Sequence, residues 1–406
     1  MSNSSTDDSR IFHWLANHPL KVVLMNINRL LFLPIAINVL IMSVYILVST
    51  TVLADTRNYK LRDSFNQFKN EYNQYEIITI DSFNPVIAAH ILNKSYLKAP
   101  VKIDGALFMP INSANSPVVM FIMSSAGPSG FTRWVKAEFW GKVVKLLNKN
   151  GIGVLFVDSF TGRGVSSTYA DQSKLSFDGM VIDALMAFKY LASDSRVDPD
   201  KIAITGHSRG GFTSIAATDR RYTDAVLGEG KHFAASIPMA APCDAMLFEN
   251  PKPSKHTKYL IFHGLADDYT PAKFCIEYGK KMEAAGANVK YELREDWYHG
   301  FFTGEMERDC SGCVFFYFCP VKPMFDDKGY VKKEFFEYAK NVLKLDTVKL
   351  SKELENDLGT KTPLKTFAKI YYEYYSECGN IGTTVSGWHG DTAASILTKF
   401  LFQSLK

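Results

Sequence analysis

The segment Gly206-His207-Ser208-Arg209-Gly210 could carry nucleophilic chemistry. It places a serine among small residues, after the apolar run 202–205 and before a helical pattern at 211–218. A sharp strand-to-helix turn of the G-x-S-x-G type needs such small flanking residues, because the serine sits at a strained apex. This turn would lift the Ser208 hydroxyl above the edge of a sheet. The alternative is an ordinary strand–helix turn with a solvent-exposed serine.

A serine hydroxyl becomes a strong nucleophile only when a base removes its proton and a third group orients that base. Two later loops offer these residue types. The run His263-Gly-Leu-Ala-Asp-Asp-Tyr-Thr-Pro271 contains a candidate acid, and Trp297-Tyr-His-Gly-Phe301 contains a candidate base. Each loop follows a short apolar run. Ser208, Asp267 and His299 are therefore predicted to meet at one edge of the sheet.

Other titratable residues remain alternatives to this assignment. Asp268 is adjacent to Asp267, but the spacing of Asp267 from the glycine and the proline of its loop favours Asp267, with Asp268 as a helix cap. His389, ahead of the last predicted helix, is a rival base. His207 is expected to pack beside the serine turn, and His263 to support the acid loop.

Strand and helix patterns alternate along the part of the chain that holds these motifs. Buried strands are predicted at 118–123, 153–157, 202–205, 234–238, 259–262 and 289–293, and helices at 134–147, 177–191, 211–218, 271–284 and 391–405. Three earlier runs, at 75–80, 86–92 and 101–109, are predicted to form an antiparallel entry to the sheet. The alternation is typical of α/β proteins with a doubly wound, mostly parallel sheet. Chemistry in such sheets gathers at the carboxyl ends of the strands.

Acyl transfer also requires donors for the oxyanion that develops on the substrate. The backbone N–H of Arg209, directly after the serine, is one candidate. The second is an N–H of the small-residue loop 124–126 after the strand at 118–123, where Ser125 is the favoured residue. The Arg209 side chain could bind an anionic part of a substrate, but we expect it to point to solvent.

Four segments together resemble the dienelactone hydrolase-like branch of the α/β-hydrolases: GVLFVDSFTGRG (153–164), GHSRGG (206–211), HGLADDYTPAKFC (263–275) and YHGF (298–301). The resemblance runs from about residue 107 to residue 302. It implies the α/β-hydrolase fold, a triad of Ser208, Asp267 and His299, and no cofactor. Founding members of that branch use a cysteine nucleophile, so Ser208 implies general esterase activity on a small-molecule ester rather than dienelactone cleavage.

The resemblance also bears on two other positions. Members of the family usually carry His-Gly where this chain has Met123-Ser124. The loop expected to supply the second oxyanion donor therefore departs from the family pattern. Cys243 and Cys275 follow neighbouring predicted strands, and similar proteins carry cysteines at these places. The resemblance therefore predicts a disulfide between Cys243 and Cys275.

The composition describes a globular protein and argues against some partners. Hydrophobic residues make up 47% of the 406-residue chain and charged residues 22%, which suffices for a large core. The net charge of +4 is small and no basic block is present, so nucleic-acid binding is not expected. The alternatives to an ester hydrolase are an oligopeptidase-like peptidase, an acyltransferase and a catalytically silent α/β-hydrolase that serves as a binding module. The sequence indicates no particular oligomeric state.

An uncharged segment spans residues 30–54. It exceeds the ~20 residues that a helix needs to cross a membrane. It is predicted to be a transmembrane signal anchor between an N-terminal tail at 1–29 and a juxtamembrane linker at 55–74. A signal peptide cleaved after Ala54, which would give a secreted protein, is the alternative. The hydrolase domain, 75–406, is expected outside the cytoplasm, because disulfides suit its cysteines better than free thiols.

The chain has six cysteines, all in its C-terminal half. Four of them lie in a predicted insertion at about 303–388, which a minimal hydrolase lacks: Cys310, Cys313, Cys319 and Cys378. They could form two disulfides or a four-thiolate zinc site, but their spacing is not that of a zinc ribbon. The insertion is expected to pack near His299 as a cover.

Overall fold

The computed structural model describes most of the chain from Tyr75 onward. The described residues are 75–111, 113–128, 139–169, 171–245, 248–303, 309–315, 325–341, 344–356, 380–384 and 387–406. The predicted tail at 1–29, membrane segment at 30–54 and linker at 55–74 lie outside these ranges. Within them, no helix is both long enough and apolar enough to span a bilayer.

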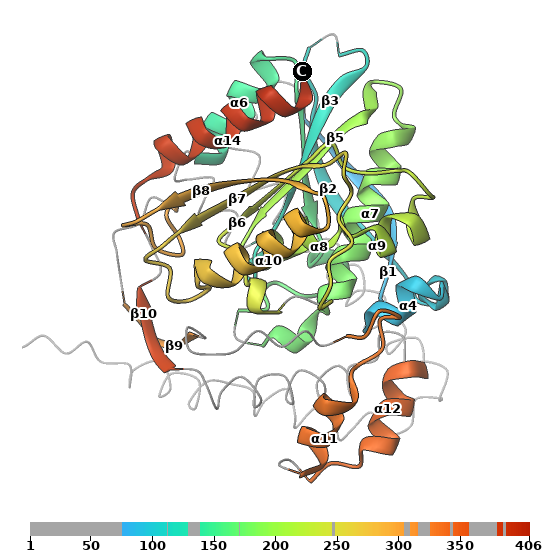
Figure 1. Ribbon diagram of the computed structural model, residues 1–406. Helices are drawn as coiled ribbons and strands as arrows, with labels where there is room; N and C mark the ends of the chain where they lie inside the picture. Colours follow the sequence, from blue (N-terminus) through green and yellow to red (C-terminus); the bar gives the residue numbers. More distant parts are fainter. Residues whose placement is uncertain are drawn as a thin grey trace, which may run out of the picture. The chain divides into compact units, whose positions relative to one another are not determined.

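One eight-stranded sheet organises the domain, with the strand order β1-β2-β4-β3-β5-β6-β7-β8 (Figure 1). Its strands are β1 (Tyr75–Phe83), β2 (Pro100–Phe108), β3 (Ser116–Ile122), β4 (Gly153–Asp158), β5 (Val197–His207), β6 (Ala235–Met239), β7 (Lys258–Gly264) and β8 (Asn288–Arg294). The β1–β2 and β2–β4 pairs are antiparallel, and the other neighbouring pairs are parallel. This mostly parallel sheet with an antiparallel entry fits the predicted α/β-hydrolase fold.

Helices cover both faces of this sheet (Figure 1). They include α6 (Phe139–Lys149), α7 (Phe177–Ser193), α8 (Arg209–Ala216), α9 (Arg220–Val226), α10 (Ala272–Ala284) and α14 (Gly390–Leu405). α6 packs on α14, whereas α7 packs on α8. All but α9 correspond to helices predicted from the sequence. The short helix α9 directly follows α8, and its charged segment has no clear apolar period.

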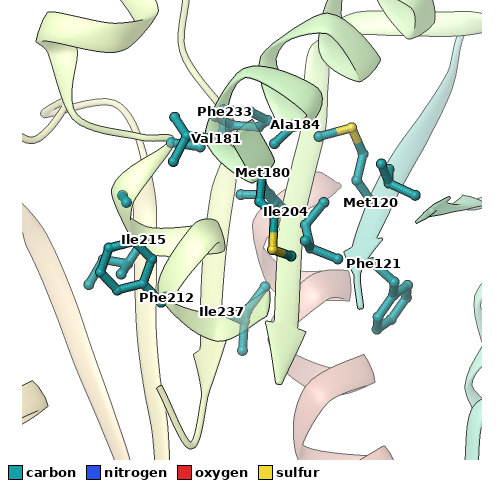
Figure 2. Packing of buried hydrophobic residues seen from close by; sticks show 14 of the residues in the cluster. Met120, Phe121, Met180, Val181, Ala184, Ile204, Phe212, Ile215, Phe233 and Ile237 are labelled. Atoms are coloured by element: carbon teal, nitrogen blue, oxygen red, sulfur yellow. The ribbon is translucent and has the colours of Figure 1, made fainter. Parts of the chain in front are cut away.

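Apolar side chains fill the space between the sheet and the pair α7 and α8. Figure 2 shows Ile204 of β5 and Ile237 of β6 beside Met180 of α7 and Phe212 of α8, and all four are fully buried. Every residue of β4 and β6 is buried, so their sequences do not alternate between apolar and polar residues. Each buried side chain of this size stabilises the fold by ~1.5–3 kcal/mol. The packed layers hold the carboxyl ends of the strands in a rigid frame.

Residues 88–92 of the run 86–92 are helical, which corrects the prediction of a strand there. Ala88–Leu92 form α4, and most of its side chains are buried. A short apolar run that is buried throughout has no period that separates a strand from a helix. The His90 ring stabilises the turn, because its Nδ1 atom accepts a hydrogen bond from the Val86 N–H at 3.1 Å.

Asp327 and Gly329 of the predicted insertion contact α9 and α4. Its helices are α11 (Lys333–Asn341) and α12 (Thr347–Asn356), and its strands β9 (Asp309–Phe315) and β10 (Asn380–Thr384) pair antiparallel. The Ala89 N–H of α4 donates to the Gly329 carbonyl at 2.9 Å. Arg221 of α9 forms an ion pair with Asp327 at 2.5 Å. The cover predicted over His299 stays a prediction, because much of the insertion lies outside the described residues.

Candidate active site

Ser208 occupies the turn between β5 and α8 in a backbone conformation that residues with a side chain rarely adopt. Its φ is 54° and its ψ is −122°. Glycines on both sides permit this turn. A Cβ atom on Gly206 would lie 2.4 Å from the carbonyl carbon of Gly210, and one on Gly210 would lie 2.1 Å from the Ile122 carbonyl oxygen. The Ser208 N–H donates to the Met239 carbonyl at 2.9 Å, which attaches the turn to the end of β6.

The predicted acid and base contact each other directly. Asp267 follows β7 and His299 follows β8, and Nδ1 of His299 lies 3.0 Å from Oδ2 of Asp267. Both residues are buried, with 1% and 6% of their surface exposed. The carboxylate that contacts His299 belongs to Asp267, whereas the adjacent Asp268 stays partly exposed.

Several donors surround the Asp267 carboxylate. The N–H groups of Tyr269 and Thr270 donate to Oδ1 at 3.1 and 2.8 Å, and Nε2 of His263 lies 3.2 Å from Oδ2. That nitrogen also lies 2.6 Å from the Thr270 carbonyl, which can only accept, so it carries the hydrogen. Burial would raise the pKa of Asp267. The charge of His299 and the hydrogen bond from His263 outweigh burial, so the pKa lies well below its usual range and the carboxylate is ionised.

The hydroxyl of Thr270 belongs to the same cluster, although the sequence motifs do not single it out. Its Oγ1 atom lies 2.9 Å from Oδ2 of Asp267, 2.9 Å from Nδ1 of His299 and 2.9 Å from the Ala240 carbonyl. The hydroxyl has one hydrogen to donate and lone pairs to accept, so it can stabilise both the acid and the base. Tyr269 borders the base as well, with its ring edge-on to the His299 ring at 4.8 Å between centroids.

His207 connects the serine turn to the loop that carries the base. Its Nε2 atom lies 2.7 Å from the His299 carbonyl oxygen, and the two rings are 4.7 Å apart. Burial lowers the pKa of His207 to about 3, and the charge of His299 acts in the same direction. A neutral His207 therefore donates from Nε2 to His299. Among the described residues, the Ser208 hydroxyl and the His299 ring lie at this shared edge without a hydrogen bond between them.

The rival base His389 has a different environment. Its ring stacks on that of Trp297 at 4.7 Å between centroids and an angle of 11°. Its N–H donates to the Phe301 carbonyl at 2.8 Å at the start of α14. The contacts of His389 are therefore those of a packing residue, and it is His299 that contacts the acid.

The candidate oxyanion residues lie at the start of α8 and in the loop after β3. Ser125 is half-buried, and its carbonyl accepts hydrogen bonds from the Thr168 N–H at 2.8 Å and the Ser167 hydroxyl at 3.0 Å. Its own N–H has no acceptor within the described part of the chain. Arg209 is the first residue of α8, where N–H groups point out of the helix end. Its side chain is only 2% exposed, which corrects the expectation that it points to solvent.

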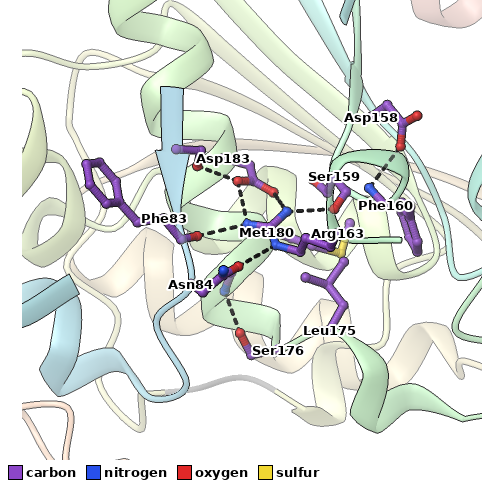
Figure 3. Close-up of polar contacts among 12 residues, drawn as sticks. Phe83, Asn84, Asp158, Ser159, Phe160, Arg163, Leu175, Ser176, Met180 and Asp183 are labelled. Atoms are coloured by element: carbon purple, nitrogen blue, oxygen red, sulfur yellow. Dashed lines mark hydrogen bonds and ion pairs between the residues drawn. The ribbon is translucent and has the colours of Figure 1, made fainter. Parts of the chain in front are cut away.

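A polar cluster around Arg163 secures the segment between β4 and α7 (Figure 3). The Arg163 guanidinium binds the buried Asp183 carboxylate at 2.7 and 2.9 Å and donates to the Phe83 carbonyl at 2.8 Å. At the end of β4, Asp158 accepts from the Phe160 N–H at 2.8 Å, and burial raises the pKa of Asp158 to about 6. These contacts anchor the chain just ahead of Ser167 and Thr168, which hold the loop of Ser125.

Cys243 and Cys275 are joined by a disulfide with an S–S distance of 1.91 Å. The bond connects the segment after β6 to α10, the helix that follows the loop of Asp267 in the chain. Cys310 and Cys313 lie on β9, while Cys319 and Cys378 lie outside the described residues, so the pairing of these four stays a prediction. In the described ranges, no group of three or more His, Cys, Asp or Glu side chains could hold a metal ion.

Residues 138–250 match the prolyl oligopeptidase family. The matched segment contains the turn at Ser208 and ends before Asp267 and His299. No curated protein matches the chain. The family match supports a serine hydrolase of the α/β-hydrolase type.

Several solved structures are similar to the chain at low identity. Dipeptidyl peptidase 4 of Porphyromonas gingivalis is 19% identical over 56% of this chain and 33% of its own, with a TM-score of 0.37. Est1E from Butyrivibrio proteoclasticus is 17% identical over 49% of this chain and 86% of its own, with a TM-score of 0.35. A proposed dienelactone hydrolase from Klebsiella pneumoniae is 15% identical over 56% of this chain and 89% of its own, with a TM-score of 0.38. The chain thus spans about a third of the dipeptidyl peptidase, and the predicted dienelactone hydrolase branch is one of several similar kinds of protein.

Proposed function

We propose that the protein is a serine hydrolase that cleaves a carboxylic ester through an acyl-enzyme intermediate. One observation carries this proposal: the buried Asp267–His299 pair is held by His207 beside the strained turn of Ser208. A strained serine with a positive φ costs on the order of 1–3 kcal/mol and persists where the surrounding structure imposes it. The reaction needs no cofactor.

In the proposed mechanism, Ser208 attacks the substrate carbonyl and His299 takes the proton of its hydroxyl. Because Nδ1 of His299 faces the ionised Asp267, Nε2 is the nitrogen that remains for Ser208. Asp267 holds the imidazole in this tautomer and stabilises the imidazolium that forms. His299 then protonates the leaving alcohol. In the second half of the reaction it removes a proton from the water that attacks the acyl-enzyme, and it returns that proton to Ser208 as the bond between Ser208 and the acyl group breaks and the acid leaves.

The oxyanion of each tetrahedral intermediate would accept hydrogen bonds from the N–H groups of Arg209 and Ser125. This role is supported by the position of Arg209 at a helix start and by the Ser125 N–H, which has no acceptor among the described residues. Fixed N–H donors stabilise the developing charge without having to reorganise during the reaction.

A fluorophosphonate probe tests the proposal, because it labels an activated serine. We expect labelling of the wild type, its loss in Ser208→Ala, and a fall in ester turnover of roughly 10⁶-fold in that variant. Ser214→Ala, which removes another buried serine of α8, serves as the control and should keep both signals. A folded wild type that neither labels nor hydrolyses any ester in a panel of varied chain length would overturn the proposal in favour of a binding module.

A peptidase is the second candidate, and the match of residues 138–250 to the prolyl oligopeptidase family favours it. The same triad would then cleave an amide. Parallel assays with matched aminoacyl esters and anilides would separate the two activities. A higher kcat/KM on the anilides would replace the esterase assignment by a peptidase.

We also propose that residues 30–54 anchor the protein in a membrane, with the catalytic domain outside the cytoplasm. The uncharged sequence of this segment and the disulfide between Cys243 and Cys275 support this location. Recovery of the full-length protein in the membrane pellet after alkaline carbonate extraction is the expected result. A mature N-terminus directly after Ala54 would instead indicate a secreted protein.

A further inference from the structure

Gln172 lies between the two residues proposed to stabilise the oxyanion. It opens the 3₁₀ turn Gln172–Lys174, ahead of α7. The Arg209 guanidinium donates from Nη1 to its Oε1 atom, and its Nε2 atom donates to the Ser125 hydroxyl at 3.1 Å. Side-chain contacts thus connect Arg209 to Ser125, which is 84 positions earlier in the chain.

The cation at one end of this connection is rigidly held. Nη2 of Arg209 donates to the Leu175 carbonyl, and its Cζ atom lies 4.2 Å from the centre of the Phe177 ring. Its Nε atom lies 3.1 Å from the sulfur of Met180. Hydrogen bonds from a buried guanidinium are about twice as strong as those between neutral groups. Arg209 therefore fixes the place of the Gln172 amide.

The orientation of that amide follows from the chemistry of its neighbours. A guanidinium can only donate, so the oxygen of Gln172 faces Arg209 and the nitrogen faces Ser125. Both ends of the amide lie within hydrogen-bond distance of the Ser125 hydroxyl, Nε2 at 3.1 Å and Oε1 at 3.3 Å, so the orientation is set by the contact with Arg209. The Ser125 hydroxyl consequently accepts a hydrogen bond whose direction is set by the cation.

The loop of Ser125 depends on this segment for its position. Its carbonyl is held by Ser167 and Thr168, as described above. A Cβ atom on Gly127, whose φ is +57°, would lie 2.5 Å from the Ser166 carbonyl oxygen, so the two segments touch directly. Ser166, Ser167, Thr168 and Gln172 thus contact the loop through backbone and side-chain atoms.

We propose that Gln172 is a positioning residue that sets the separation of the two oxyanion donors. It does so by connecting the side chain of Arg209 to that of Ser125, while the N–H groups of the same two residues bind the oxyanion. The inference rests on the proposed function. Oxyanion donors act over a narrow range of distances, about 2.7–3.1 Å, so a shift of a few tenths of an ångström in the loop lowers the rate of the chemical step.

Gln172→Met tests the proposal, because it keeps the length of the side chain and removes both hydrogen bonds. We expect kcat to fall by roughly 10- to 100-fold, less than the 10²–10³-fold cost of deleting an oxyanion donor, while KM stays within about twofold. Lys174→Met, in the same turn but exposed, is the matched control and should retain wild-type kcat. An unchanged kcat in folded Gln172→Met would overturn the proposal.

Ser125→Ala provides a second test that leaves the contact between Arg209 and Gln172 intact. It removes the accepting hydroxyl but keeps the backbone N–H, and should lower kcat as much as Gln172→Met. Because Gln172 acts through Ser125, the double variant should be no slower than either single variant. Wild-type kcat in Ser125→Ala, or losses that multiply in the double variant, would contradict the proposal even if Gln172→Met failed to fold.

Labelling by the fluorophosphonate probe separates this inference from the proposed function. If the wild type labels at Ser208 and hydrolyses esters but the Gln172 and Ser125 variants equal it, the role of Gln172 alone is refuted. If the wild type shows neither signal, the hydrolase assignment itself fails, and the positioning role fails with it.

Discussion

The two sides of the candidate active site are built in different ways. The acid–base side, formed by Asp267, Thr270 and His299, comes from the loops after two neighbouring strands and is closed by direct contacts of 2.9–3.0 Å. The oxyanion side, formed by Ser125, Gln172 and Arg209, joins three distant segments through one amide side chain. The first side depends on the geometry of two loops. The second side depends on the contacts that Thr168, Gln172 and Phe177 make with Ser125 and Arg209.

Two buried carboxylates, Asp267 on the acid–base side and Asp178 outside both sides, have pKa values shifted in opposite directions. Asp267 has several N–H donors and His299 beside it, and its pKa is lowered. Asp178, in the first turn of α7 next to Phe177, is also buried, and the Tyr222 hydroxyl donates to it at 2.7 Å. Burial raises the pKa of Asp178 to about 7, because Tyr222 and the Asp178 N–H offset it only in part. Donors and charges, rather than depth, therefore decide which buried carboxylate is ionised.

The largest effect is expected on the acid–base side. Asp267→Asn should lower kcat by ~10⁴-fold, because the amide cannot hold the reactive tautomer of His299. Steady-state kinetics on the best ester of the panel measure this loss. Asp268→Asn is the matched control and should stay within about threefold of the wild type. A severe loss in Asp268→Asn with an active Asp267→Asn would reverse the assignment of the acid.

A pH-dependent effect on stability is expected beside the oxyanion side. The folded pKa of Asp178, about 7, exceeds the ~3.9 of an unfolded aspartate, so the folded state binds this proton more tightly. The contribution of this proton to the free energy of unfolding is fully present below about pH 4 and is lost as the pH rises through 7. Relative to Asp178→Asn, the wild type should therefore lose roughly 2–4 kcal/mol of unfolding free energy between pH 4 and pH 8.

Urea denaturation of the wild type and of Asp178→Asn across this pH range measures that difference. Asp200→Asn, at an exposed position, is the control and should follow the wild-type profile. Parallel profiles for the wild type and Asp178→Asn would show that Asp178 does not take up a proton on folding.

A smaller effect is expected for the Thr270 hydroxyl. Thr270→Val keeps the shape of the side chain and the backbone contacts with Asp267 and His263, but removes the oxygen beside His299. We expect kcat to fall about tenfold, which corresponds to a hydrogen bond of about 1.4 kcal/mol. Thr270→Ser restores the hydroxyl and should recover most of the activity. If valine and serine behave alike, the hydroxyl does not contribute to the acid–base side.

The smallest effect is expected for His389, which lies outside both sides. His389→Phe keeps the aromatic stack on Trp297 and should leave kcat within about twofold of the wild type. Ester hydrolysis at several pH values is the measurement. Loss of the acid limb of the pH–rate profile in this variant would make His389 a base after all.

The sequence motifs predict the acid–base side better than the oxyanion side. Ser208, Asp267 and His299 each lie in a short motif whose local pattern predicts the turn around it, and the structure brings Asp267 and His299 into contact. Thr270 lies within one of these motifs, but only the fold brings its hydroxyl to His299. Gln172 belongs to no motif, because its role depends on two partners distant in sequence.

Two errors have a common physical cause. The solvent-facing orientation expected for Arg209 and the strand expected at 86–92 both rest on local preference, and tertiary contacts override each of them. Arg209 is covered by Gln172, Leu175 and Phe177. In the buried run at 86–92, the His90 ring accepts a hydrogen bond from the Val86 N–H and so stabilises the helical turn.

The disulfide between Cys243 and Cys275 has a consequence for handling the protein. Each cysteine is only 1% exposed, so a reductant in the buffer reaches the bond only when the chain opens. The oxidation state of a purified sample therefore reports the compartment in which that chain folded, and not the solution in which it is stored. Preparations from reducing and oxidising hosts would be chemically different proteins, and their masses should be compared before their rates.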